Sequence, residues 1–401
     1  MSMAKPKILY IGDLDLRLGG AQRITFDTLR CLSENFDFIM YSDKDPSGDF
    51  LRLLNELNIP YFIDYSLNEN NITRVIRDYN INALLIQWED IRWLTLVASL
   101  ADKLGIRSIA MVHELPYIFI PMSRFINNFK ALSLLKLLKE YLRGHLHGIR
   151  TLRMVLNLDK TVKKMTTLIC VGDASKYYYQ RYLGVNCISI TPEVTIPKEI
   201  LMQNDEHHND NEFNYDVAFM SARHEAEKGI YDVVKITKVA KESLGRDLRV
   251  AIMGKFLHRK VERKFYSLLK KYQLRQDFEV LGFVPEGIKY SILRRSKVFL
   301  YPSRKDVFSI SLAEALSMGT PAVVYDLPFT RIYNTSGVIR VKYRNIKDMA
   351  HEVVKIINLS EKYPDKYLVL RMQVMEYVKR TFTLERTCKE LKEAIKYSLG
   401  E

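Results

Sequence analysis

The sequence predicts an α/β fold with two tandem Rossmann-like, doubly wound domains, and three observations carry this prediction. Short runs rich in β-branched and aromatic residues alternate with segments of helical length along the whole chain. The runs are continuously apolar, as is typical of parallel strands buried on both faces. With 401 residues, the chain is long enough for two domains of roughly 150–200 residues each. We expect the two domains to face a cleft, because ligands bind at the carboxyl ends of such strands.

The expected strands are distributed evenly over the two halves of the chain. In the first half they are residues 7–11, 36–41, 83–87, 107–112, 167–172 and 187–190. In the second half they are residues 216–220, 248–253, 278–282, 297–301, 321–325 and 338–342. Between the halves, QNDEHHNDNEFN is polar and has no periodicity, which indicates a linker. We therefore predict an N-terminal domain at 1–200, a linker at 201–214, a second domain at 215–375 and a closing helical segment at 376–401.

The start of the chain, its apolar runs and its cysteines bear on the cellular compartment of the protein. MSMAKPKILYIG lacks the apolar core of a signal peptide, and no apolar run reaches the roughly 18–20 residues that span a bilayer. The cysteines are scattered and form no CxxC pair. That spacing argues against a zinc site and against a disulfide framework, and it favours a reducing compartment. We expect a soluble, cytoplasmic protein.

A net charge of +14 suggests an anionic partner: nucleic acid, an anionic membrane face or a phosphorylated substrate. The charge gathers between Arg124 and Lys164, where ten Lys or Arg residues stand against two acids and leucines lie among them. Such a stretch is typical of a helix on a membrane surface or facing a partner. A solvated pair of helices with ordinary leucine packing explains it equally well.

Two features of the first half are candidate ligand contacts. Gly19 and Gly20 open a predicted helix after the first strand, where the backbone can approach an anion closely. Their spacing is not GxGxxG, and a tight strand-to-helix turn would also need them. His113 ends the run SIAMVHEL, at the place where a parallel sheet delivers side chains to a ligand. A structural histidine is an equally good interpretation.

The second half offers cations on a loop that follows a strand. In SARHEAEKG, Arg223 and Lys228 precede Gly229, which leads into a helical pattern. Two cations there can hold a diphosphate and stabilise the charge that develops as it leaves. Because acids also lie in this loop, a charged surface loop is the alternative.

The stretch DVFSISLAE places Asp306 and Glu314 on either side of a predicted helix start. One interpretation is a capping box, in which Ser311 caps the helix and Glu314 reaches back to its amide. The other is a binding corner, in which two carboxylates grip the hydroxyls of a sugar and a ribose. The amides near Ser309 and Ile310 would then face phosphates.

These motifs resemble those of the retaining glycosyltransferases of family 4, which have the two-domain GT-B fold. SARHEAEKG resembles the family's G-R-x-x-x-x-K-G loop, and MGKF and LGFVP resemble its next two strand ends. YPSRKDVFSISLAEALSMGTPAVV resembles its E-x7-E segment, with Asp306 and Glu314 as the two acids. LGGAQR and MVHE resemble the glycine loop and the histidine-bearing strand end. The closing segment FTLERTCKELKEAIKY resembles one that crosses back to the N-terminal domain.

The resemblance implies a role for each matched residue. His113 would lie beside the transferred sugar, Arg223 and Lys228 would hold the diphosphate, Asp306 the sugar hydroxyls and Glu314 the ribose hydroxyls. The implied donor contacts are completed by Gly19, Gly20, Gly229, Phe283, Val284, Phe308, Ser309 and Ile310. The chain departs from the family at Asp306, where a glutamate is usual, and at Val307 and Ser309, where glycines are usual. These departures leave the identity of the sugar open.

We therefore expect a metal-independent, retaining glycosyltransferase without a bound cofactor. Its partners would be a nucleotide-sugar donor, a glycan or lipid-linked acceptor and an anionic membrane surface. One alternative is a catalytically weak protein of this fold that uses its basic face to bind nucleic acid or a partner. The sequence lacks the interleaved aromatic and basic motifs of common RNA-binding modules, which disfavours nucleic acid. Another alternative is a nucleotide-sugar epimerase of the same fold.

Overall fold

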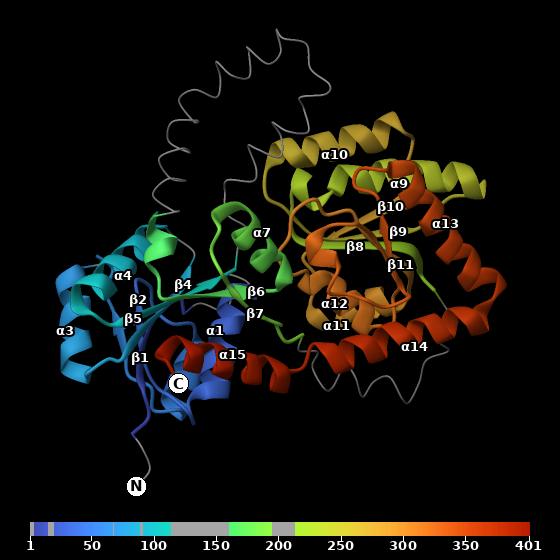
Figure 1. Ribbon diagram of the computed structural model, residues 1–401. Helices are drawn as coiled ribbons and strands as arrows, with labels where there is room; N and C mark the ends of the chain where they lie inside the picture. Colours follow the sequence, from blue (N-terminus) through green and yellow to red (C-terminus); the bar gives the residue numbers. More distant parts are fainter. Residues whose placement is uncertain (1–3, 15–19, 67, 89–90, 114–159, 195–212) are drawn as a thin grey trace. The chain divides into compact units, whose positions relative to one another are not determined.

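The computed structural model describes residues 4–14, 20–66, 68–88, 91–113, 160–194 and 213–401 (Figure 1). The chain divides into two compact units. The first comprises Met1–Pro192 together with Glu385–Glu401, and the second comprises Glu193–Leu384. The first unit therefore takes in the end of the chain as well as its beginning.

The described part of the first unit is a seven-stranded parallel sheet in the order β3-β2-β1-β4-β5-β6-β7. Its strands are β1 (Lys7–Ile11), β2 (Asp37–Ser42), β3 (Tyr61–Ile63), β4 (Ala83–Trp88), β5 (Arg107–Val112), β6 (Thr167–Val171) and β7 (Ile188–Ile190). Its helices are α1 (Gly20–Leu32), α2 (Gly48–Glu56), α3 (Glu69–Tyr79), α4 (Ile91–Leu104), α7 (Asp173–Leu183) and α15 (Leu384–Leu399).

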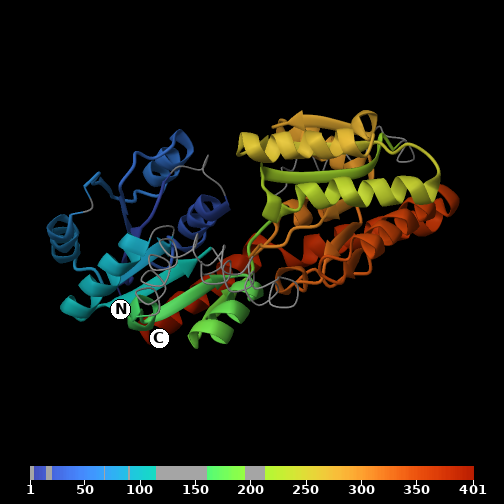
Figure 2. The ribbon, with the colours of Figure 1, turned by 90° about the horizontal axis from the view of Figure 1, so that it is seen from above.

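Helices cover both faces of this sheet. Buried side chains of α3 and α4 pack on one face, and those of α1, α2 and α15 pack on the other. In Figures 1 and 2, the red helix α15 lies among the blue-to-green elements of this unit. Leu391, Ala394 and Ile395 are the residues that α15 contributes to the core. The closing helix thus completes the hydrophobic core of the first unit.

The second unit is a six-stranded parallel sheet in the order β10-β9-β8-β11-β12-β13. Its strands are β8 (Tyr215–His224), β9 (Val250–Phe256), β10 (Phe278–Gly282), β11 (Ser296–Tyr301), β12 (Ala322–Tyr325) and β13 (Val338–Val341). Its helices are α9 (Ile230–Leu244), α10 (Arg259–Lys271), α11 (Glu286–Arg294), α12 (Ile310–Ser317), α13 (Ile346–Lys362) and α14 (Pro364–Thr381). Short 3-10 turns lie at Ala226–Lys228, Arg275–Asp277 and Pro328–Thr330. Buried residues of α9, α10 and α13 share one core with the strands.

The predicted fold class, two doubly wound α/β domains, is confirmed. In the second unit the strand order reverses between β8 and β11, and in the first between β1 and β4. Strand β3 was not predicted, because it is a three-residue edge strand whose side chains are only partly buried. The basic stretch between Arg124 and Lys164 lies outside the described residues except for its last five positions, and so does most of the linker predicted at 201–214.

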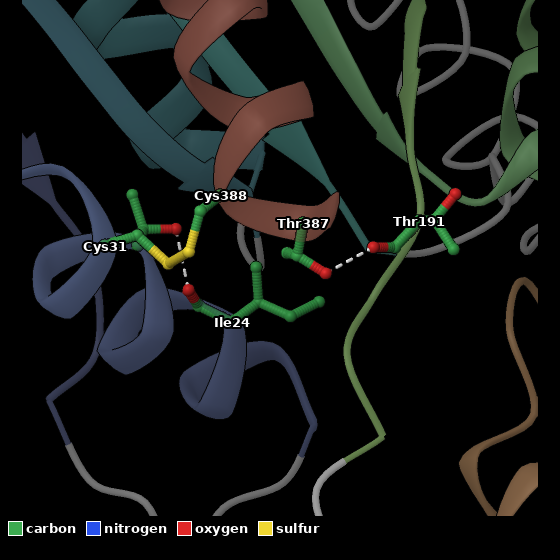
Figure 3. Close-up of a disulfide and its surroundings, with 6 residues drawn as sticks. Ile24, Cys31, Thr191, Thr387 and Cys388 are labelled. Atoms are coloured by element: carbon green, nitrogen blue, oxygen red, sulfur yellow. Dashed lines mark hydrogen bonds between the residues drawn. A yellow bond between two sulfur atoms is a disulfide. The ribbon is translucent and has the colours of Figure 1, made fainter. Parts of the chain in front are cut away.

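The expectation that the cysteines form no disulfides was wrong. Cys31 of α1 is bonded to Cys388 of α15 (Figure 3), and Cys170 of β6 is bonded to Cys187, just before β7. The partners are 357 and 17 residues apart in sequence, with Cα–Cα distances of 5.4 and 5.8 Å. The spacing of the cysteines along the chain did not predict the two disulfides, because the folded structure is what brings the partners together, as it brings α1 next to α15.

The start of α15 is also tied to the end of the β7 segment. The Thr387 hydroxyl donates a hydrogen bond of 2.6 Å to the carbonyl of Thr191 (Figure 3). The backbone N–H of Thr191 in turn donates to the carboxylate of Glu390 at 2.5 Å. Within the described part of the chain, no helix is long and apolar enough to cross a membrane.

Candidate active site

The loop after β8 places Lys228 beside the end of β11, at the switch point of the second sheet. Gly229 follows Lys228 with φ 85°, and a Cβ there would lie 2.2 Å from the carbonyl oxygen of Pro302. Only glycine permits both this conformation and this approach. The glycine therefore brings the loop that carries Lys228 against the loop that follows β11.

Lys228 is paired with Asp306 across the switch point. Its Nζ donates to Oδ2 of Asp306 at 2.8 Å, and the Tyr301 hydroxyl donates to the same oxygen at 2.6 Å. Lys228 and Asp306 expose 30% and 13% of their side chains. Burial alone would lower the pKa of the Lys228 ammonium, but the charge and the hydrogen bond of Asp306, together with nearby Tyr301 and Glu225, outweigh burial and raise that pKa. Lys228 is therefore a fixed, permanent cation.

Arg223 differs from Lys228 in that it is exposed. Its guanidinium makes no ion pair with any described residue, whereas its carbonyl accepts a hydrogen bond of 2.7 Å from the Ser221 hydroxyl. The main chain of Arg223 is thus fixed while its charge stays available. The loop provides one held cation and one free cation, which suits a ligand with two phosphates.

Glu314 lies on α12 and is held by two residues of α11. Oε1 of Glu314 accepts from Lys289 Nζ at 2.7 Å and from the Tyr290 hydroxyl at 3.2 Å. Oε2 of Glu314 accepts no hydrogen bond from the described residues. The carboxylate is 13% exposed, so its free oxygen can still meet a ligand.

The capping box predicted at Ser311 and Glu314 is not formed. Helix α12 begins at Ile310, and its N-cap is Ser309, whose hydroxyl accepts from the N–H of Leu312 at 3.2 Å. Ser311 therefore lies inside the helix. The Glu314 carboxylate pairs with Lys289 instead. The S-x-x-E pattern of the sequence therefore predicts an N-cap two residues after the observed one.

The remaining predicted donor contacts of this half fall into buried and exposed groups. Phe308 and Ser309 are buried, with the Phe308 ring against Tyr333 and the Ser309 carbonyl accepting from the Tyr333 hydroxyl at 2.7 Å. Ile310 is exposed and Val284 is partly buried. Phe283 is 73% exposed, and Lys255 Nζ lies 5.4 Å from its ring centroid. Phe283 thus offers a flat aromatic surface beside a cation.

The predicted residues of the first unit are His113, Gly19 and Gly20. His113 directly follows β5; its Nε2 is buried and has no hydrogen-bond partner among the described residues, and burial lowers the pKa of the imidazole from 6.5 to about 3. His113 is therefore neutral at physiological pH. Gly20 is the first residue of α1, and Gly19 lies outside the described residues.

Sequence reasoning missed several residues around these groups. Gln87, near the end of β4, is 3% exposed; its Oε1 accepts from the Thr25 hydroxyl at 2.5 Å, while its Nε2 has no partner in the described part of the chain. A glutamine within the apolar run ALLIQW was the signal that could have revealed it. Tyr301, Lys289 and Tyr290 carried no comparable signal, because their role depends on contacts between elements. The described residues contain no cluster of three or more His, Cys, Asp or Glu that could hold a metal ion.

A family model of known proteins matches the second half of the chain. Residues 203–395 match the family model described as glycosyl transferases group 1, a span just under half of the chain. A search of curated proteins gives no match.

Solved structures match over nearly the whole chain. One is a glycosyltransferase from Rickettsia africae, with 15% identity, a TM-score of 0.67, and coverage of 98% of this chain and 99% of that one. Another is HepE of Anabaena in complex with UDP-glucose, with 14% identity, a TM-score of 0.66, and coverage of 98% and 99%. A third is WaaG, a glycosyltransferase involved in lipopolysaccharide biosynthesis, with 11% identity, a TM-score of 0.61, and coverage of 98% and 100%.

At these identities the structural likeness establishes the fold alone, which is that of the GT-B glycosyltransferases. The group 1 domain and this fold together support a transferase, and specifically a GT-B glycosyltransferase.

Proposed function

We propose that the chain is a retaining glycosyltransferase that moves a sugar from a nucleotide-diphosphate sugar to an acceptor without a metal ion. One observation carries the proposal. At the switch point between β8 and β11, the fixed cation Lys228 lies beside the loop that leads into α12, and Glu314 on that helix keeps a free carboxylate oxygen. Open α/β sheets bind their ligands at this location.

Each part of the donor has a suitable counterpart in the second unit. Arg223 and Lys228 supply the cations for the diphosphate, and the first amides of α12, after Ser309, supply N–H donors for an anion. Oε2 of Glu314 suits the hydroxyls of a ribose. The exposed ring of Phe283 suits stacking with a base. HepE, which has the same fold, was solved in complex with UDP-glucose, and this supports a nucleotide sugar as the ligand.

The chemistry requires charge stabilisation more than proton transfer. As the bond between the sugar and the diphosphate breaks, positive charge spreads over the sugar ring and negative charge builds on the leaving group. A cation that is already fixed, as Lys228 is, stabilises that leaving group without reorganising during the reaction. Retention of the anomeric configuration is proposed from the motifs that resemble family 4.

For the acceptor, we propose a glycan or a lipid-linked molecule. The neutral His113 imidazole and the Gln87 amide, at the ends of neighbouring strands in the first unit, suit hydroxyl groups better than anions. WaaG, which shares the fold, is involved in lipopolysaccharide biosynthesis, and this supports a membrane-linked acceptor. The net charge of +14 suits an anionic membrane face.

The test begins with thermal shifts against UDP-, GDP- and ADP-sugars, because a ligand of the native state raises its apparent stability. The selected donor is then incubated with the enzyme in water, so that water accepts the sugar, and proton NMR reports the anomeric configuration of the free sugar first released. We expect the donor's configuration and a rate that EDTA does not change. An inverted product would contradict retention, and an epimerised donor would contradict transfer.

A further inference from the structure

The carboxylate of Asp306 is already engaged by the protein on both of its oxygens. Oδ1 accepts the backbone N–H of Val307 at 3.0 Å, and Oδ2 accepts both Tyr301 and Lys228. Glu314 is the contrasting case, since its two hydrogen bonds from described residues go to one oxygen and leave the other open. Of the two acids, only Glu314 has a carboxylate oxygen that accepts no hydrogen bond from the described residues.

Lys228 has the complementary arrangement. An ammonium group has three N–H donors. One is directed to Asp306, and a second, longer contact of 3.4 Å goes to the carbonyl oxygen of Lys305. One donor therefore remains for a phosphate oxygen, and the other two fix where it points.

Tyr301 gives this arrangement rigidity. Its side chain is buried, its ring is stacked on Phe299 with centroids 5.8 Å apart, and its hydroxyl donates to the carboxylate of Asp306. A glutamate at position 306 would carry its carboxylate one methylene further, so we expect the same contacts to require a shift of the loop or of Lys228. The aspartate is thus the length that fits this pairing.

We propose that Asp306 is a positioning residue that aims Lys228 at the donor's diphosphate, and that it does not bind the sugar. This inference rests on the proposed function, and it changes the role that the family resemblance implies for Asp306. It also gives a physical reason for the departure from glutamate at this position.

Titration calorimetry with a nucleoside diphosphate and with its sugar conjugate separates the two roles. The pair is UDP with UDP-glucose, GDP with GDP-mannose or ADP with ADP-glucose, whichever stabilises the wild type most. If Asp306 acts through Lys228, D306N weakens both ligands by the same factor, roughly tenfold. A loss confined to the sugar conjugate would overturn the inference and leave the proposed function standing.

A double-mutant cycle gives a readout that a general structural defect would not. In a Lys228→Met background, D306N should cause no further loss of affinity for either ligand, because the cation it positions is gone. A further loss for the sugar conjugate would contradict the inference. Asp326→Asn is the matched control, since Asp326 follows the neighbouring strand β12 and, among the described residues, its carboxylate pairs only with exposed Arg331 at 3.6 Å; its affinities should equal those of the wild type.

Two further outcomes have to be considered: a folding defect in D306N, and a wild type that binds none of the ligands. If D306N melts below the assay temperature, Asp306→Glu replaces it; the charge is kept, and displacement of Lys228 should weaken both ligands equally. Unchanged affinity for the diphosphate in Asp306→Glu would overturn the inference. A wild type that binds none of the three pairs would contradict the proposed function and, with it, this inference.

Discussion

The two sheets share one strand order around their switch points, yet the groups at the carboxyl ends of their strands differ. In the second unit, Lys228 with Asp306 and Lys289 with Glu314 form charged pairs between neighbouring elements. In the first unit, the equivalent edge carries His113 Nε2, a buried, neutral atom with no partner among the described residues, and, nearby, Gln87 Nε2. The charge of Asp13, after β1, is already matched by Lys44.

This difference indicates that the topology of the sheet determines where a ligand binds, whereas the side chains at that place determine which ligand binds. Charges that are held in pairs but keep one open donor or acceptor suit a diphosphate and a ribose. Neutral donors in a buried setting suit hydroxyl groups, since an anion there would lack a cation. The comparison can be tested by removing each group in turn.

Replacing Lys228 by alanine should have the largest effect. Loss of a fixed cation at the leaving group should lower the transfer rate by about 10²–10³-fold, as for removal of one preorganised donor. Initial rates at saturating donor measure this. Lys235→Ala, which removes a partly exposed lysine of α9 that lies 3.7 Å from Asp232, is the matched control and should keep the wild-type rate. Full activity in Lys228→Ala would mean that the second unit does not hold the diphosphate through this residue.

Replacing His113 by alanine should lower transfer by about ten- to a hundredfold, because the hydrogen bond that we propose between His113 and a substrate hydroxyl is lost. The affinity for the nucleoside diphosphate should stay unchanged, and this separates the first unit from the second. His351→Ala, on the exposed face of α13, is the control. A matching loss of diphosphate affinity in His113→Ala would remove the distinction between the two units.

Replacing Glu314 by glutamine should weaken the diphosphate ligand by about tenfold, because the amide holds ribose hydroxyls less well than a carboxylate. The melting temperature should fall only slightly, since Ser309, and not Glu314, caps α12. Calorimetry and thermal melts of the same sample decide between the two effects. Unchanged affinity with a much lower melting temperature would make Glu314 a structural residue.

The smallest effect concerns pH. Burial lowers the pKa of His113 to about 3 and that of His224 to about 4, against 6.5 ordinarily. At a pH between the lowered pKa values and 6.5, these histidines bind protons in the unfolded chain and not in the folded chain. The free energy of unfolding should therefore fall as the pH drops from about 6.5 toward 4. Melting temperatures across this range should fall less in His113→Asn than in the wild type. Parallel curves for the two proteins would show that His113 stays exposed enough to titrate normally.

The sequence predicted most strands to within one or two residues at their starts, because continuous apolar runs such as KILYI and TLICV are buried on both faces. It missed β3, which lies at a sheet edge and lacks that burial. It placed the helix start at Ser311, since two serines, two residues apart, lie at the start of the helix and only the backbone distinguishes them. Site partners such as Lys289 remained hidden, because they depend on how α11 packs against α12.

The bridge between Cys31 and Cys388 also has a topological consequence. The peptide chain passes between the two units twice, at residues 192–193 and again at 384–385, and both passages lie inside the loop that the bridge closes. The molecule is therefore a covalent ring with two short tails. A protease that cuts one passage leaves a single species on a non-reducing gel, and only added reductant separates it into two fragments.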